Sequence, residues 1–325
     1  MLPNFKLRKF MLRKFTAWAI GLMFALVSLS SVFAQQPQAK PAPAPGSAAD
    51  LVQQGDKLSH EGKQDDALAL YRQAIEKSPD SYEAHLGMGE ALDLKGDYAQ
   101  AREHLEKAID LAPADSKSQP LRAMAVSYAF ESEGAKAEEY EVQVFDARSR
   151  KDDFVAAGET CTELARIYLE SGDPDQAYKW YKTGYETALR KPDMSEADKN
   201  LWLFRWENAQ ARIAARQGKA DEAKQHISAA KAALDKANNP DQARFYPYLT
   251  GYVAFYLKDY KAAIADLQKA DQRDPLNLAL LGEAFEKSGE AAKAKEYYRR
   301  VLESNAHNPT NAFARPLAKK KMAGS

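Results

Sequence analysis

Small and large apolar residues recur along this chain at a fixed interval, and no stretch alternates apolar and polar residues in the manner typical of a β-strand. Residues 48–81 superimpose on residues 82–115 at a spacing of 34 residues. Seven positions are then identical: Gly55/Gly89, Leu58/Leu92, Gly62/Gly96, Ala67/Ala101, Ala74/Ala108, Ile75/Ile109 and Pro79/Pro113. The pattern predicts helices throughout, built from a repeated unit.

Each unit is predicted to be a pair of antiparallel helices. Gly55 falls midway along the first helix and Ala67 on the second, where small side chains let the two helix axes approach closely. Tyr71 fills the space beside them. Gly62 stands at the turn, where glycine adopts a positive φ as a helix C-cap. Pro79 ends the second helix because proline lacks an N–H and disfavours helix before it.

This pattern of Gly-x2-Leu, then Ala-x3-Tyr, then Pro resembles the signature of the tetratricopeptide repeat (TPR) at its own repeat length. The same frame can be followed to the C-terminus, more loosely in the middle of the chain. We predict an all-α, right-handed α-solenoid of about seven TPR-like helix pairs, stacked because no pair can bury its apolar faces alone. The predicted pairs are residues 48–81, 82–115, 116–151 (divergent), 152–192, 193–238, 239–275 and 276–304.

Residues 1–34 have the features of a secretory signal peptide. Five basic residues precede an apolar stretch from Ala17 to Val32, and small side chains occupy the positions before Ala34 that a signal peptidase reads. We expect cleavage after Ala34 and a periplasmic or secreted bacterial protein, with translation from Met1 or from Met11. The alternative is an uncleaved membrane anchor, although the apolar run is at the short end for a spanning helix.

Two further segments flank the predicted repeats. Residues 35–47 are rich in proline and alanine and are expected to form an extended linker. Residues 305–325 contain two prolines and three consecutive lysines. We expect them to form a C-terminal tail that caps the last repeat through Phe313 and Leu317 and then frays.

The charge balance changes once the signal is set aside. The chain contains 46 Lys and Arg against 46 Asp and Glu. Residues 1–34 hold five of the basic residues and no acidic one, which leaves 41 against 46. A mildly acidic chain has no electrostatic reason to hold nucleic acid or anionic lipid. We therefore expect no nucleic-acid partner and no membrane insertion after signal cleavage.

The sequence shows no catalytic or cofactor-binding pattern. It contains no phosphate-cradling Gly-rich loop, no GxSxG and no HExxH. No two of the five histidines are three or four residues apart, so no metal site is predicted. The single cysteine, Cys161, is interpreted as a small buried hydrophobe rather than a reactive thiol. We predict a protein that is not an enzyme and needs no cofactor.

Partner binding is expected on the concave surface, which first helices line in proteins of this family. The Lys and Asn clamp of the best-known TPR subclass has no counterpart in the first two units, where acids such as Asp56 and Glu90 stand instead. Farther along, a basic strip neighbours an aromatic one. The candidate partner-binding residues are Arg205, Asn208, Arg212, Arg216, Phe245, Tyr248, Tyr252, Phe255 and Tyr256.

Arginine and tyrosine are frequent binding hot spots, so these residues predict a groove for an acidic, partly apolar segment. The alternative is that the aromatic residues form core between repeats and the arginines a solvated face.

The TPR resemblance implies a non-catalytic protein–protein interaction scaffold that binds a peptide or partner protein on its concave face, in the bacterial envelope. A second interpretation is an accessory or regulatory subunit that recruits substrate to a partner enzyme. A third, a catalyst in its own right, lacks a recognisable residue set. The sequence indicates neither the partner, nor the pathway, nor the oligomeric state.

Overall fold

The structure is a computed structural model that describes residues 43–324. The predicted signal peptide and most of the linker lie outside the described residues. Residues 42–325 form one compact unit, whose described part contains sixteen helices and no strand. Across residues 43–324, none of the helices combines the length and the apolar character that crossing a membrane requires.

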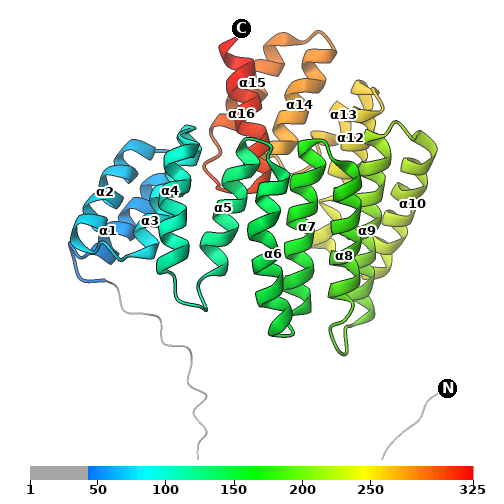
Figure 1. The fold of residues 1–325 in the computed structure, drawn as a ribbon. Helices are drawn as coiled ribbons and strands as arrows, with labels where there is room; N and C mark the ends of the chain where they lie inside the picture. The colour runs from blue at the N-terminus through cyan, green and yellow to red at the C-terminus, as the bar shows by residue number, and fades with distance from the viewer. Residues whose placement is uncertain (1–42, 325) are drawn as a thin grey trace, which may run out of the picture. The chain divides into compact units, whose positions relative to one another are not determined.

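Fourteen of these helices form seven antiparallel hairpins that pack side by side in chain order (Figure 1). The hairpins are α1 (Ala48–His60) with α2 (Gln64–Lys77), α3 (Tyr82–Lys95) with α4 (Tyr98–Leu111), α5 (Ser118–Phe130) with α6 (Gly134–Arg150), α7 (Phe154–Ser171) with α8 (Pro174–Ala188), α9 (Glu196–Arg216) with α10 (Ala220–Ala237), α12 (Tyr246–Tyr256) with α13 (Tyr260–Leu267), and α14 (Pro275–Lys287) with α15 (Ala291–Leu302). A short α11 (Pro240–Ala243) precedes α12, and α16 (Pro309–Ala323) follows the last hairpin. The prediction of an all-α solenoid of about seven helix pairs is confirmed.

Glycine permits both the turn and the close contact inside a hairpin. Gly96 ends α3 in the left-handed conformation with a φ of 105°, which glycine adopts without steric cost. Gly89 lies midway along α3, where a Cβ atom would stand 2.6 Å from Cγ of Leu105 and 3.0 Å from the carbonyl oxygen of Ala101. The axes of α3 and α4 are therefore too close for a side chain at residue 89.

The second helix of each hairpin carries one alanine that is excluded from solvent. These alanines are Ala67, Ala101, Ala137, Ala177, Ala223, Ala263 and Ala294. Four residues later most hairpins place a large apolar or aromatic side chain, such as Tyr71, Leu105 or Tyr181, which is buried against the first helix. The third hairpin is the exception, because Glu141 occupies this position and is fully buried. The divergence predicted for residues 116–151 is thus visible in the core.

The residues after 304 form an ordered helix. The side chain of Asn308 accepts a hydrogen bond from the backbone N–H of Asn311 and begins α16, which packs against α14 and α15 and also returns to α5 and α7. The Arg315 guanidinium donates to the carbonyl oxygen of Leu94 at 2.8 Å, at the end of α3. Since α3, α5 and α7 are all first helices, α16 covers part of the surface on which partners were expected.

The expectation that residues 305–325 fray is wrong. Leu317 packs beside the last repeat as expected, but Phe313 joins a cluster with Leu94 and Ile167 near the start of the solenoid. The segment is held because its polar side chains satisfy carbonyl groups left open where α3 ends, and its apolar face meets two sets of repeats at once.

Candidate functional site

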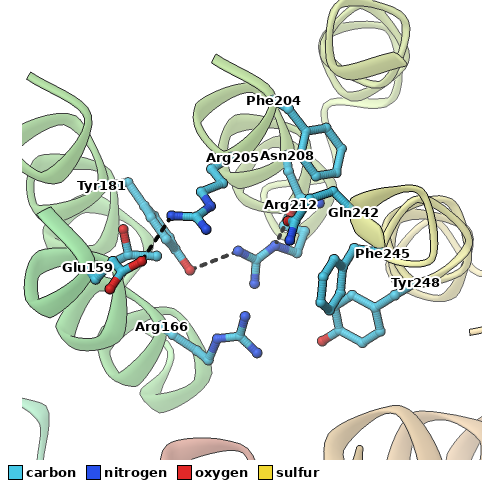
Figure 2. Close-up of a pocket in the computed structure, with 11 residues that line it drawn as sticks. Glu159, Arg166, Tyr181, Phe204, Arg205, Asn208, Arg212, Gln242, Phe245 and Tyr248 are labelled. Atoms are coloured by element: carbon cyan, nitrogen blue, oxygen red, sulfur yellow. Dashed lines mark hydrogen bonds and ion pairs between the residues drawn. The ribbon is translucent and has the colours of Figure 1, made fainter. Parts of the chain in front are cut away.

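A cavity of about 320 Å³ lies between α7, α9 and α12, the first helices of the fourth, fifth and sixth hairpins (Figure 2). Side chains from α8 and α11 complete its wall. The lining residues are Glu159, Thr162, Arg166, Tyr181, Phe204, Arg205, Asn208, Arg212, Gln242, Phe245 and Tyr248. Five of the nine candidate residues from the sequence are among them: Arg205, Asn208, Arg212, Phe245 and Tyr248.

The lining follows the repeat frame. The turns after α7, α9 and α12 contain Gly172, Gly218 and Lys258, each with a positive φ. Counted back from these turns, each first helix supplies the same positions to the cavity and its surroundings. The sets, in the order α7, α9 and α12, are Glu159, Arg205 and Phe245; Thr162, Asn208 and Tyr248; Arg166, Arg212 and Tyr252; and Glu170, Arg216 and Tyr256.

Arg212 is held firmly but incompletely satisfied. Its side chain is buried, with 3% of the residue surface exposed. Its Nε donates to Oδ1 of Asn208 at 3.0 Å and its Nη2 donates to the hydroxyl of Tyr181 at 2.8 Å, as Figure 2 shows. Within the described residues the third nitrogen, Nη1, is buried and has no hydrogen-bond partner. The guanidinium is therefore fixed in place with one group still able to donate.

Two other groups face the same space. The Tyr248 hydroxyl is buried and has no hydrogen-bond partner among the residues that the structure describes. Burial and the Glu170 carboxylate raise the pKa of that hydroxyl, so it stays protonated and able to donate. The Arg166 side chain extends from α7 towards the cavity (Figure 2) and makes no hydrogen bond or ion pair within residues 43–324.

The rim carries an exposed ion pair. Arg205 Nη1 lies 3.4 Å from Oε1 of Glu159, and both side chains remain accessible to water. Phe245 adds an aromatic ring with 36% of its surface exposed. The cavity thus combines charged donors inside with an apolar and charged rim.

The remaining candidate residues form a separate, mostly structural network. The guanidinium of Arg216 pairs with Glu170 and also donates through Nε to the hydroxyl of Tyr252 at 2.7 Å. The Tyr252 hydroxyl donates in turn to Glu170 at 3.1 Å, and its ring is fully buried. Tyr256 lies beneath the Arg216 guanidinium, 4.5 Å from the ring centroid, and Phe255 packs edge-on against it. The aromatic strip is therefore divided between cavity and core.

Sequence reasoning missed the contribution of α7, namely Glu159, Thr162 and Arg166. The signal that could have found them is the 46-residue spacing between Gly172 and Gly218, which also relates Arg166 to Arg212. Tyr181 was recognised only as a repeat-packing residue, yet its hydroxyl positions Arg212.

The rest of the described chain offers no obvious alternative centre. Within residues 43–324 no group of three His, Cys, Asp or Glu residues is placed to hold a metal ion. His85 and His104 approach with their Nδ1 atoms 3.0 Å apart, but they are a pair alone. Cys161 is buried, and burial together with Glu141 raises the pKa of its thiol to about 12. The arrangement at the α7, α9 and α12 cavity is suited to recognising a ligand through hydrogen bonds and charge.

Few known sequences resemble this chain over much of its length. A region of 63 residues is 38% identical to human protein O-mannosyl-transferase TMTC1, which is 19% of this chain. The match spans only 7% of the length of that protein.

Solved structures show similarity over much more of the chain. The apo form of RapI has a TM-score of 0.51 and 13% identity, over 86% of this chain and 99% of that one. A Rap protein complexed with Competence and Sporulation Factor has a TM-score of 0.50 and 13% identity, over 86% of this chain and 76% of that one. At this identity the similarity shows the fold alone.

Sequence models of the tetratricopeptide repeat match residues 58–125, 160–195, 248–275 and 277–308. These segments together make up about half of the chain and include residues of α7 and α12 that face the cavity. The repeat spacing, the stacked hairpins and these matches agree, and the chain belongs to the tetratricopeptide repeat family.

Proposed function

We propose that the protein is a non-catalytic interaction scaffold that holds a peptide or a segment of a partner protein at the cavity between α7, α9 and α12. The observation that carries this proposal is the pair of buried, unpartnered groups, Arg212 Nη1 and the Tyr248 hydroxyl. Buried polar groups in folded proteins nearly always have a partner. A bound ligand would supply it here.

The family and the repeat frame support this proposal. Stacked repeats present an extended surface of first helices, and such surfaces suit elongated partners. One protein of similar fold was solved in complex with Competence and Sporulation Factor. Because α16 covers part of α3, α5 and α7, the α7, α9 and α12 cavity is the part of the first-helix surface best placed to accept a partner.

We also propose that the protein works in the bacterial envelope, after export and removal of residues 1–34. The basic start, the apolar stretch and the small residues before Gln35 support this location. Cell fractionation and N-terminal sequencing of the protein from its host test the proposal. A mature chain beginning at Gln35 is expected, and a cytosolic chain beginning at Met1 or Met11 would contradict it.

Site-specific photo-crosslinking in the native host tests the scaffold function. A photoreactive phenylalanine analogue replaces Phe245 at the cavity rim, and in a matched variant it replaces Tyr178 on α8, which has 42% of its surface exposed. We expect a defined protein to be crosslinked from position 245 and not from position 178. The absence of any crosslinked protein, or the same set of proteins from both positions, would count against the proposal.

A further inference from the structure

The charges around the cavity leave a positive surplus. Two arginines are already neutralised by carboxylates, since Arg216 pairs with Glu170 and Arg205 with Glu159.

The other two, Arg166 and Arg212, remain without a carboxylate in contact within the described residues. The nearest compensation is Asp274, the N-cap of α14, whose carboxylate accepts from the N–H of Leu276 at 2.9 Å and acts on Arg166 only through space. One positive charge is thus left over.

The free donors converge on the same space. Arg166 and Arg212 extend into it from neighbouring first helices, and Tyr248 approaches from the third (Figure 2). A guanidinium is always charged and presents its N–H groups in a planar fork that matches a carboxylate. A buried guanidinium nitrogen without a partner costs free energy, so an anionic group placed there would be bound with a charge-assisted hydrogen bond.

We propose that this cavity is a subsite for a single carboxylate of the bound partner, with Arg166 and Arg212 as its charged donors and the Tyr248 hydroxyl as a third. The inference rests on the proposed function, because the carboxylate belongs to a peptide: an Asp or Glu side chain, or a chain end. Phe204 and Phe245 beside the donors accept a neighbouring apolar side chain. A surplus of one charge matches a carboxylate better than a phosphate group, which carries close to two negative charges at neutral pH.

Three small probes separate the sources of the carboxylate. N-acetylphenylalanine carries a terminal carboxylate, N-acetyl-aspartyl-phenylalaninamide carries a side-chain carboxylate, and N-acetylphenylalaninamide carries none. Each is titrated into the purified protein, with inorganic phosphate as a fourth probe, and the arginine Nε–H resonances are followed by NMR. We expect one or both carboxylates to shift the resonances of Arg166 and Arg212, and the uncharged amide to bind at least about tenfold more weakly.

Two variants remove single donors. Arg166→Gln changes a half-buried side chain that holds no other residue, and Tyr248→Phe removes only a hydroxyl, so both are expected to fold. Each should weaken carboxylate binding, Arg166→Gln by at least about tenfold. Arg205→Gln is the matched control, because Arg205 is already paired with Glu159, and it should change binding less than about twofold.

Urea denaturation verifies that each variant is folded, and Tyr248→Phe remains decisive if Arg166→Gln does not fold. Equal binding of the carboxylates and the amide, equal binding by the variants and the wild type, or a preference for phosphate would each overturn the subsite.

The same variants separate the failure of the subsite from the failure of the scaffold function. If Arg166→Gln captures the partner from position 245 as well as the wild type, and the carboxylate probes do not bind, the subsite is wrong and the scaffold function stands. If the carboxylate probes bind at Arg166 and Arg212 but no protein is captured, the subsite stands and the scaffold function is wrong.

Discussion

His307 donates a hydrogen bond through Nε2 to Oδ2 of Asp93 at 2.8 Å, and so joins the segment before α16 to α3 across most of the chain. The other Asp93 oxygen accepts from the Ser127 hydroxyl at 2.9 Å, and Nδ1 of His307 lies 4.0 Å from Oε1 of Glu90. Burial and the nearby Arg122 disfavour the imidazolium, but the two carboxylates outweigh them and raise the pKa of His307.

This contact predicts that α16 is held less firmly in alkaline solution. A histidine whose pKa is raised in the folded state contributes stability in full below its unfolded pKa of about 6.5, and that contribution is lost as pH rises through the folded value. We expect the hydrogen-exchange protection factors of α16 to fall between pH 6 and pH 9. In His307→Gln they should be lower at pH 6 and vary less with pH, and the same pH dependence in both proteins would contradict the assignment.

The contact between Gly89 and α4 predicts an unusual response to substitution. Replacing a helical glycine normally stabilises a helix. In Gly89→Val, however, the new side chain would meet Leu105 and the backbone of Ala101, and we expect a loss of about 1–3 kcal/mol. Ala99→Val on the exposed side of α4 is the control and should cost less than about 1 kcal/mol. Urea denaturation of the two variants measures the difference, and equal costs would show that the helices can separate.

Glu141 predicts a stabilising substitution. Both of its carboxylate oxygens are buried without a partner in the described residues, and burial, followed by Glu163, raises its pKa well above the usual value. Glu141→Leu installs the kind of side chain that Leu105 supplies in the second hairpin, and we expect it to stabilise the protein by about 1–3 kcal/mol.

The gain should be larger at pH 7 than at pH 4, because a group with a raised folded pKa loses its stabilising contribution as pH rises. Thermal unfolding at the two pH values measures it. Glu139→Leu, at an exposed position of α6, is the control and should change stability by no more than about 0.5 kcal/mol. A destabilised Glu141→Leu would mean that the carboxylate is satisfied in a way that the packing does not reveal.

Cys161 is predicted to be unreactive in the folded protein. Its side chain is buried, and a thiol with a pKa of about 12 holds almost no thiolate at neutral pH. We expect iodoacetamide to label it only as fast as the protein opens, so that denaturant increases labelling by several orders of magnitude. Fast labelling under native conditions, measured by intact mass, would show an open path to α7.

The seven hairpins could be predicted from the sequence because their packing depends on small residues at fixed intervals, and Gly89 and Ala101 lie where the pattern placed them. The helix α16 could not, since it belongs to no repeat and is held by contacts to residues such as Leu94 that are more than two hundred positions away.

The cavity was partly predictable. The strip that includes Arg205 and Arg212 followed from the frame of α9, but periodicity alone does not tell whether an arginine points to water or to another helix. Arg216 shows this limit, because its partners Glu170 and Tyr252 lie on two other hairpins.

The return of α16 to α5 and α7 changes how the array is expected to come apart. In an open repeat protein each unit contacts only its neighbours, so terminal units can melt while the middle persists. Here a single helix touches both the closing and the opening repeats, and either end can loosen only if that helix detaches. The repeats should therefore be lost together in one sharp transition, with the last turn of the chain setting the stability of the first.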